Sequence, residues 1–491
     1  MGIIFNNNIY AIDDNNSNTK NEDSNILPIY TFPINNYPQD LNYWLSDTVS
    51  TTNILLDKPL QQKKFNQLKS HYFGMKQTDQ SPWSESFVKK VLLGIQDKNI
   101  YTIETQMSEA INNQLMEKKN IGYGINYLPY AKSWSDSILD NMNLPQFNQL
   151  SYSMQNRAIV TSDVTAFVTP TKSPWYKKYS IAGEGFPFNH NRISNIYTGT
   201  PVYIIGVSKD SQWYLVLTPH FIGWVNSLHI AKANNIFIQS WRHYLSHGMI
   251  AITGVSVGIF NHAHDLVSIA HAGTILPLAK KNKDTYDVVL PIKSFFGVAV
   301  IQKGTISNND SVIMPLSPTY DNFKIMIGKV MGHLYGWGGY MGYNDCSSEL
   351  QGIFTAFGMF MPRNSLQQTQ MGELIDLTKY TPKERMDYII KNGHPMMTLV
   401  YIPGHIMLYV GNKKMTDGTV APVVYQNLWG FQKRNENARY VVGGSILLPM
   451  LLSYDSASSY ISHLEKPIFK ISQLDVDGAD YDLFANIFEG K

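Results

Sequence analysis

The sequence has very little cysteine: Cys346 is the only one in 491 residues. A lone thiol has no partner for an intrachain disulfide, and it cannot contribute to a cluster of cysteine ligands around a metal. Both structural uses are therefore excluded. Cys346 is either an inert residue of the core or a nucleophile.

Long apolar runs and a large net charge are also absent. No stretch approaches the roughly eighteen consecutive apolar residues that a membrane-spanning helix needs. The formal net charge of +2 argues against binding to nucleic acid or another polyanion as the main role. The length favours several domains, because single cores seldom grow beyond about 250 residues.

The residues after Cys346 have apolar side chains at the spacing of one helical face. These are Leu350, Ile353, Phe354 and Phe357. Asn344 or Asp345 is a suitable N-cap, and Gly358 is a suitable C-terminal stop. Cys346 then lies in the first turn, where free N–H groups and the helix dipole stabilise a thiolate. We therefore expect its pKa to be lowered and its sulfur to be nucleophilic.

A histidine able to take the proton of this thiol opens a later apolar segment. Residues 403–411 read PGHIMLYVG, which predicts a strand with His405 at its start and alternate side chains on opposite faces. The next predicted strand, at 423–430, contains Gln426 and Asn427. Either amide carbonyl could accept a hydrogen bond from the imidazole and fix its tautomer. The thiol, the imidazole and one amide would then form a catalytic triad.

Together these motifs resemble the NlpC family of papain-like bacterial cell-wall peptidases. The matching pieces, in order, are Tyr335-Gly336-Trp337-Gly338-Gly339, Asp345-Cys346-Ser347, Pro362-Arg363-Asn364-Ser365 and Gly404-His405 up to Gly411. The resemblance covers about residues 320–430. It implies a cysteine peptidase that cleaves the γ-D-glutamyl–diamino acid bond of peptidoglycan stem peptides.

The resemblance also implies the catalytic roles. By position, Cys346 is the nucleophile and His405 is the base. Gln426 is the orienting residue, at a place where relatives often have a second histidine. With glutamine in place of histidine, the base has a neutral hydrogen-bond acceptor beside it.

Three further residues are expected to contact the substrate. Asp345 would bind the free α-amine of an N-terminal L-alanine through a charge-assisted contact, and Ser347 would contact the same peptide. The Tyr335 hydroxyl, with the backbone N–H of Cys346, could stabilise the tetrahedral oxyanion. Arg363, by contrast, is expected to close a turn before the next helix.

The whole chain predicts a multidomain α+β protein. Residues 1–28 are polar and asparagine-rich and predict a flexible N-terminal segment. Residues 29–150 have a broken helical pattern that resembles the N-terminal stabilising module of some NlpC-type enzymes. Short β-rich runs at 151–236 and 237–318 resemble two small all-β Src-homology-3-like barrels. Residues 319–491 are then the C-terminal papain-like α+β peptidase domain.

Two features of the barrels bear on the site. The loop at 183–188 is expected to lean over the catalytic cleft and to block longer substrates attached to glycan. The second barrel contains four residues that could suggest a metal site, His262, His264, Asp265 and His271. No helical i,i+4 pair and no cysteine accompany these residues, so we predict no metal.

We therefore predict a cysteine endopeptidase that hydrolyses peptidoglycan-derived peptides with a free N-terminal L-alanine. It is expected to act as a monomer, without a cofactor and without nucleic acid. The alternatives are a peptidoglycan amidase or an acyltransferase of the same superfamily, or a non-catalytic cell-wall-binding protein.

The expected location depends on the start of the chain and on the role of the enzyme. The first eleven residues have too little apolar length for a secretory signal. The cell envelope or periplasm is expected if this start lies inside a longer signal sequence. The cytoplasm is expected if the enzyme recycles released peptides.

Overall fold

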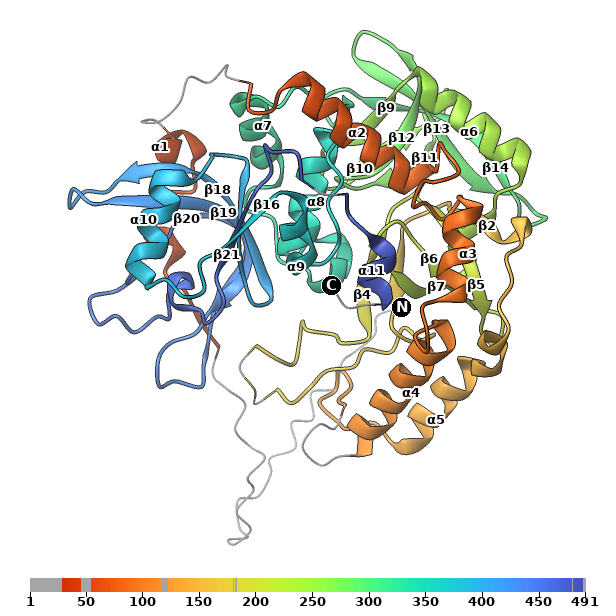
Figure 1. The fold of residues 1–491 in the computed structure, drawn as a ribbon, viewed down its shortest axis with the longest axis horizontal. Helices are drawn as coiled ribbons and strands as arrows, with labels where there is room; N and C mark the ends of the chain where they lie inside the picture. Colours follow the sequence, from red (N-terminus) through yellow and green to blue (C-terminus); the bar gives the residue numbers. More distant parts are fainter. Residues whose placement is uncertain are drawn as a thin grey trace, which may run out of the picture.

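A computed structural model describes residues 29–45, 54–116, 122–179, 181, 183–478 and 480–488. The flexible segment predicted at 1–28 lies outside these residues. Three seven-stranded sheets, with helices before, between and around them, make up the described chain (Figure 1). The predicted fold class, a multidomain α+β protein with two all-β units ahead of a mixed C-terminal domain, is confirmed.

Among the described residues, five α-helices precede the first barrel. They are α1 (Leu41–Leu45), α2 (Lys58–Phe73), α3 (Glu85–Leu93), α4 (Ile100–Met116) and α5 (Lys132–Asn141). The Trp83 indole, just before α3, donates to the carbonyl of Ala158 at 2.8 Å, which ties these helices to the barrel that follows. Among the described helices of the chain, none is long and apolar enough to cross a membrane.

The first barrel is an antiparallel sheet in the order β4-β3-β7-β6-β5-β2-β8. Its strands are β2 (Arg157–Val160), β3 (Val164–Phe167), β4 (Arg192–Ile196), β5 (Pro201–Val207), β6 (Trp213–Leu217), β7 (Ile222–Asn226) and β8 (Ile230–Lys232). Alternate side chains from these strands fill one apolar core. The long connection from β3 to β4 carries the loop at 183–188 toward the C-terminal domain.

The second barrel follows helix α6 (Asn235–His247) and has the order β11-β10-β14-β13-β12-β9-β15. Its strands are β9 (Met249–Ile252), β10 (Val257–Phe260), β11 (Leu266–Ala270), β12 (Ile275–Lys281), β13 (Thr285–Lys293), β14 (Ala299–Ser307) and β15 (Ser311–Ile313). His271 pairs with Asp163 of the first barrel at 2.6 Å. Within the described ranges, no three histidine, cysteine or acidic side chains gather in a way that could hold a metal ion.

The C-terminal domain is a mixed sheet in the order β1-β20-β19-β18-β17-β21-β16. The strands after the barrels are β16 (Glu373–Asp376), β17 (Thr398–Ile402), β18 (His405–Lys414), β19 (Val420–Phe431), β20 (Arg439–Pro449) and β21 (Lys470–Gln473). The helices are α7 (Tyr320–Val330), α8 (Cys346–Ala356), α9 (Ser365–Gln368), α10 (Pro382–Asn392) and α11 (Leu483–Phe488).

The two faces of β18 pack into different cores, as the predicted alternation requires. Ile406 and Leu408 share a core with Phe354 of α8. Met407 and Tyr409 share another with Ile389 of α10. Helix α8 therefore lies on one face of the sheet and α10 on the other (Figure 1). The Ile406 N–H near the start of β18 is directed at Cys346, the first residue of α8.

The first and the last described elements of the chain pack against segments that lie far from them in the sequence. Residues Ile29–Thr31 form β1, which pairs in parallel with β20, so this part of the predicted 29–150 module lies in the C-terminal sheet. A strand this short obtains its hydrogen bonds from the open edge of β20 and leaves little periodic signal in the sequence. Helix α11 lies beside α3 and β4 (Figure 1), where the ammonium of Lys90 stands 3.9 Å from the ring centre of Phe484. The domain boundaries remain predictions.

Candidate active site

Cys346 is the first residue of α8, and Asp345 caps this helix. The Asp345 carboxylate accepts a hydrogen bond from the Ser348 N–H at 3.0 Å. In return, the Ser348 hydroxyl oxygen accepts a hydrogen bond from the Asp345 N–H at 2.9 Å. This reciprocal capping box satisfies two backbone donors at the helix start. The predicted cap at Asp345 and the stop at Gly358, which has φ +76°, are both present.

A glycine-rich loop lies against the start of α8. Gly338 and Gly339 have φ of 58° and 82°, which disfavours residues with a side chain. A Cβ on Gly339 would stand 2.6 Å from the Asn195 side chain, so the first barrel approaches this loop too closely for any larger residue. Arg192 of β4 donates to the carbonyl oxygens of Gly338 and Gly339, each at 2.8 Å. These hydrogen bonds thus fix the first barrel to the glycine-rich loop beside the site.

His405 opens β18 and is hydrogen-bonded to Gln426 of β19. His405 Nε2 and Gln426 Oε1 are 2.6 Å apart. With the amide oxygen facing it, Nε2 is the donor, and Nδ1 is left as the proton acceptor. Asn427 projects from the opposite face of β19 and donates to Glu349 at 3.0 Å. Of the two amides that the sequence offers, Gln426 is therefore the partner of the imidazole.

The sulfur of Cys346 lies at the same end of β18. The backbone N–H groups of Ile406 and Ser347 are directed at it, and Ile406 directly follows His405. Burial lowers the pKa of His405 to about 4, so the ring is neutral near neutral pH and can accept a proton. The structure therefore pairs His405 with Gln426 and places the Cys346 sulfur beside the backbone of the residue that follows His405. Their catalytic roles remain predictions.

The expected lowering of the pKa of Cys346 is wrong. Burial removes the water that would solvate a thiolate, and the neighbouring Asp345 carboxylate opposes a second negative charge. Together they raise the pKa of Cys346 to about 12. The Ser347 N–H at the helix start favours the thiolate, as predicted, and so do the Ile406 N–H and the Arg363 guanidinium, but together they are outweighed. Cys346 is thus a neutral thiol at rest.

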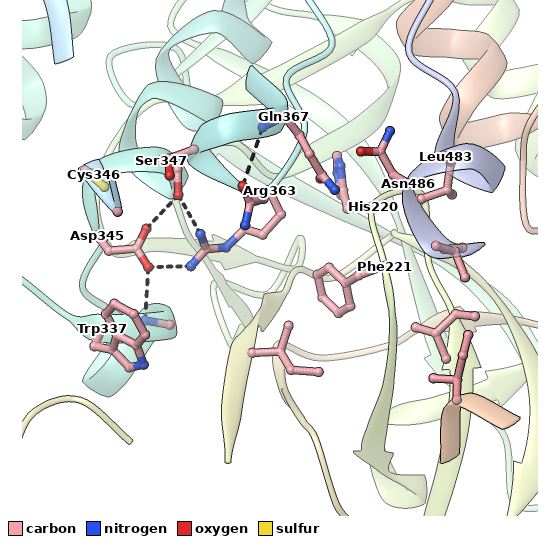
Figure 2. A pocket seen from close by; sticks show the side chains of 18 of the residues that line it. His220, Phe221, Trp337, Asp345, Cys346, Ser347, Arg363, Gln367, Leu483 and Asn486 are labelled. Atoms are coloured by element: carbon pink, nitrogen blue, oxygen red, sulfur yellow. Dashed lines mark hydrogen bonds and ion pairs between the residues drawn. The ribbon is translucent and has the colours of Figure 1, made fainter. Parts of the chain in front are cut away.

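Asp345 and Arg363 form a buried ion pair, which Figure 2 shows beside Ser347. Arg363 Nη2 lies 2.5 Å from Asp345 Oδ2, and Nη1 lies 2.7 Å from the Ser347 hydroxyl. Arg363 Nε also donates to the Ser194 hydroxyl of β4 at 2.6 Å. The expectation that Arg363 closes a turn away from the substrate site is therefore wrong. No motif or spacing in the sequence predicts that the side chain of residue 363 contacts residue 345.

A cavity of about 500 Å³ opens at Cys346, Asp345 and Ser347. Its walls come from four parts of the chain: α4, the first barrel, the start of the C-terminal domain and α11. The lining includes Glu104, Ile193, Phe221, Tyr335, Arg363 and Asn486. Tyr335, predicted to contact substrate, borders this cavity, and burial together with the nearby Cys346 raises the pKa of its hydroxyl. The sequence did not point to Glu104 or Asn486, because no motif surrounds them.

Aromatic contacts anchor the loop at 183–188 on the C-terminal domain. The Phe188 ring lies 5.2 Å from that of Trp337 and 5.7 Å from that of Trp429, in edge-on arrangements. The Trp337 indole donates to the carbonyl of Asn189 at 3.2 Å. The loop therefore leans toward the site, as predicted.

Comparisons with known proteins agree with this architecture. A model of the SH3 domain (SH3b1 type) matches residues 174–226. The chain is similar in structure to an NlpC/P60 endopeptidase from Photobacterium damselae subsp. piscicida, with a TM-score of 0.77 and 24% identity over 92% of this chain and 100% of that one. A weaker match is an NlpC/P60 family protein from Bacillus cereus ATCC 10987, with a TM-score of 0.41 and 16% identity over 62% of this chain and 98% of that one. No curated protein matches the sequence. The chain thus has an NlpC/P60 endopeptidase-like fold with an SH3 domain.

The neutral state of the thiol predicts the pH dependence of its alkylation. We expect iodoacetamide to react slowly with Cys346 at about pH 7 and progressively faster up to about pH 10, because only the thiolate reacts. Mass spectrometry of the intact protein measures the rate, and no other cysteine is present to interfere. Cys346→Ser is the unlabelled control. A rate that levels off below about pH 7 would show an ionised sulfur and contradict the assignment.

The ion pair predicts a large effect of Asp345→Asn on stability. The variant leaves Arg363 charged and buried without a counter-ion, so the free energy of unfolding should fall by about 3 kcal/mol in urea titrations. Asp387→Asn, which breaks the exposed Lys383–Asp387 pair, is the matched control and should cost less than about 1 kcal/mol.

The Asp345–Arg363 ion pair also predicts how the difference in stability between wild type and Asp345→Asn depends on pH. Burial alone would raise the pKa of Asp345, but Arg363 together with the N–H groups of Ser348 and Gly338 outweighs burial, and the pKa is lowered. The stabilisation is therefore complete above the unfolded pKa of about 3.9 and is lost as the pH falls through the folded pKa. The gap between wild type and Asp345→Asn should accordingly narrow in acid. A gap that is constant down to about pH 2 would contradict the pairing.

Proposed function

Taking the NlpC/P60 endopeptidase-like fold as the premise, we propose that this chain is a cysteine peptidase that hydrolyses the γ-D-glutamyl–diamino acid bond of peptidoglycan stem peptides. The observation that carries the proposal is the His405–Gln426 hydrogen bond of 2.6 Å, at the strand end that the Cys346 sulfur faces. This bond leaves Nδ1 of His405 as the acceptor for the proton of the thiol.

The neutral resting pair sets the order of the proton movements. As Cys346 Sγ attacks the γ-carbonyl carbon of D-glutamate, its proton passes to His405 Nδ1, and Gln426 Oε1 accepts from Nε2–H of the imidazolium. Collapse of the tetrahedral intermediate breaks the C–N bond, and His405 returns the proton to the leaving amine. Water then hydrolyses the thioester and regenerates the thiol. The Tyr335 hydroxyl and the Cys346 N–H would stabilise the oxyanion.

The cavity at Cys346 supports a short acyl-side peptide with a free amine. Two carboxyl groups, of Asp345 and Glu104, border it against one guanidinium, that of Arg363. Burial raises the pKa of Glu104 to about 7, and an ammonium group beside it would favour its charged form. Helices α4 and α11 form walls of the cavity, which supports the expectation that glycan-attached peptides are excluded.

One observation favours the alternative of a non-catalytic wall-binding protein. The raised pKa of Cys346 is also what an inert buried thiol would have. Hydrolysis by the purified protein separates the two functions directly.

We expect replacement of the triad residues to lower activity to different extents. Cys346→Ala should abolish hydrolysis, and Gln426→Ala should lower kcat by about tenfold to a hundredfold because the imidazole loses its fixed tautomer. Gln62→Ala, on the exposed face of α2, is the matched control and should be unchanged. Circular dichroism checks that each variant is folded. Activity retained in Cys346→Ala would refute the nucleophile.

The form of the substrate provides a second test. The free tripeptide L-Ala-γ-D-Glu-diamino acid should be cleaved to L-Ala-γ-D-Glu, whereas the N-acetylated tripeptide and intact sacculi should be cleaved much more slowly. Mass spectrometry of the products identifies the bond. Cleavage between muramic acid and L-alanine would indicate an amidase, and transfer of the acyl group to an added amine would indicate an acyltransferase.

A further inference from the structure

A second cavity, of about 230 Å³, opens on the His405 side of the site. It lies between the ends of β18, β19 and β20, the segment 461–466 and Gly183 of the first-barrel loop. His405, Trp429 and His463 line it. Cys346 lines the other cavity, so the nucleophile and the base face different spaces.

The chemistry of the proposed reaction determines which part of the substrate each cavity would hold. The acyl part of the substrate becomes attached to Cys346 and must occupy the cavity that Cys346 lines. The leaving amine receives its proton from His405, so the residue that carries this amine must lie on the imidazole side. The second cavity is therefore the place for the leaving diamino acid.

The charged groups of the two cavities differ. Arg439 and Lys466 line the second cavity, and no aspartate or glutamate is among its lining residues. The first cavity carries the carboxyl groups of Glu104 and Asp345, of which Asp345 is paired with Arg363. A peptide with an ammonium at its start and a carboxylate at its leaving end would match both.

Arg439 is a fixed positive charge. Its side chain is buried, and Nη2 donates to the carbonyl oxygens of Ile181 at 2.7 Å and Tyr179 at 3.2 Å. It also donates to the carbonyl of Glu184. These bonds hold the first-barrel loop over the cavity, and Arg439 Nε has no hydrogen-bond partner among the described residues.

Lys466 is the available cation. Its ammonium has no ion pair or hydrogen bond with any residue that the structure describes. The adjacent acid, Glu465, is engaged by Arg434 and by the N–H of Ser462 at 3.1 Å. Burial lowers the pKa of Lys466. An anion bound in the cavity would offset this cost of burying an unpaired ammonium.

We propose that the second cavity receives the leaving diamino acid and that Lys466 binds a carboxylate of that residue. The inference rests on the proposed peptidase function and adds the residue that selects the leaving group. The carboxylate has two possible sources. One is the α-carboxylate at the C-terminus of a tripeptide, and the other is the second carboxylate of diaminopimelate, which lysine lacks.

Four tripeptides separate these sources: L-Ala-γ-D-Glu with diaminopimelate or lysine in third place, each with a free or an amidated C-terminal α-carboxylate. For the peptides that carry the bound carboxylate, Lys466→Met should raise KM by about tenfold to a hundredfold with kcat nearly unchanged. Lys466→Arg should restore most of the loss. Lys383→Met, the same substitution on the exposed face of α10, is the matched control.

The pattern of the effect identifies the source. If Lys466 binds the α-carboxylate, amidation of the C-terminus removes the effect of Lys466→Met for both diamino acids. If it binds the second carboxylate of diaminopimelate, the effect persists on amidation and is absent with lysine. An equal loss on all four peptides, or no loss on any, overturns the role of Lys466 while the peptidase function stands. If wild type cleaves none of them, the proposed function itself fails and this inference with it.

Discussion

The buried ion pair between Asp345 and Arg363 is the contact on which the geometry of the site depends. Asp345 caps α8, accepts from the Gly338 N–H at 3.1 Å and binds the Arg363 guanidinium. Arg363 also donates hydrogen bonds to the hydroxyls of Ser347 and of Ser194 in the first barrel. A buried charge pair is tolerated only when its remaining donors and acceptors are satisfied. Here these partners come from the helix, the glycine loop and the barrel, so one pair sets their relative positions.

Local patterns predicted the elements that carry the catalytic groups. The apolar spacing after Cys346 predicted α8, and the alternation after His405 predicted the two faces of β18, because both depend on neighbours along the chain. Alternation also explains why only one of the two adjacent amides reaches the imidazole. Gln426 and Asn427 must project from opposite faces of β19, and only the position of β18 decides which face holds His405.

Properties that arise from distant segments could not be predicted. The pKa of Cys346 depends on how completely the folded chain buries it, and this burial has no signature near residue 346. Glu104, Arg439 and Lys466 stand outside any motif and reach the site only through the tertiary fold. The Ser347 N–H at the helix start favours the thiolate, as predicted, but desolvation has the larger effect on the pKa.

The position of α11 makes the enclosure of the cavity depend on the last described helix. Asn486 and Leu483 line the cavity at Cys346, although they lie far along the chain from residues 335–365. Tertiary contacts hold α11 in this place, among them that of the Lys90 ammonium of α3 with the Phe484 ring. A change that loosens α11 would therefore open the wall of the cavity and leave the His405–Gln426 hydrogen bond untouched.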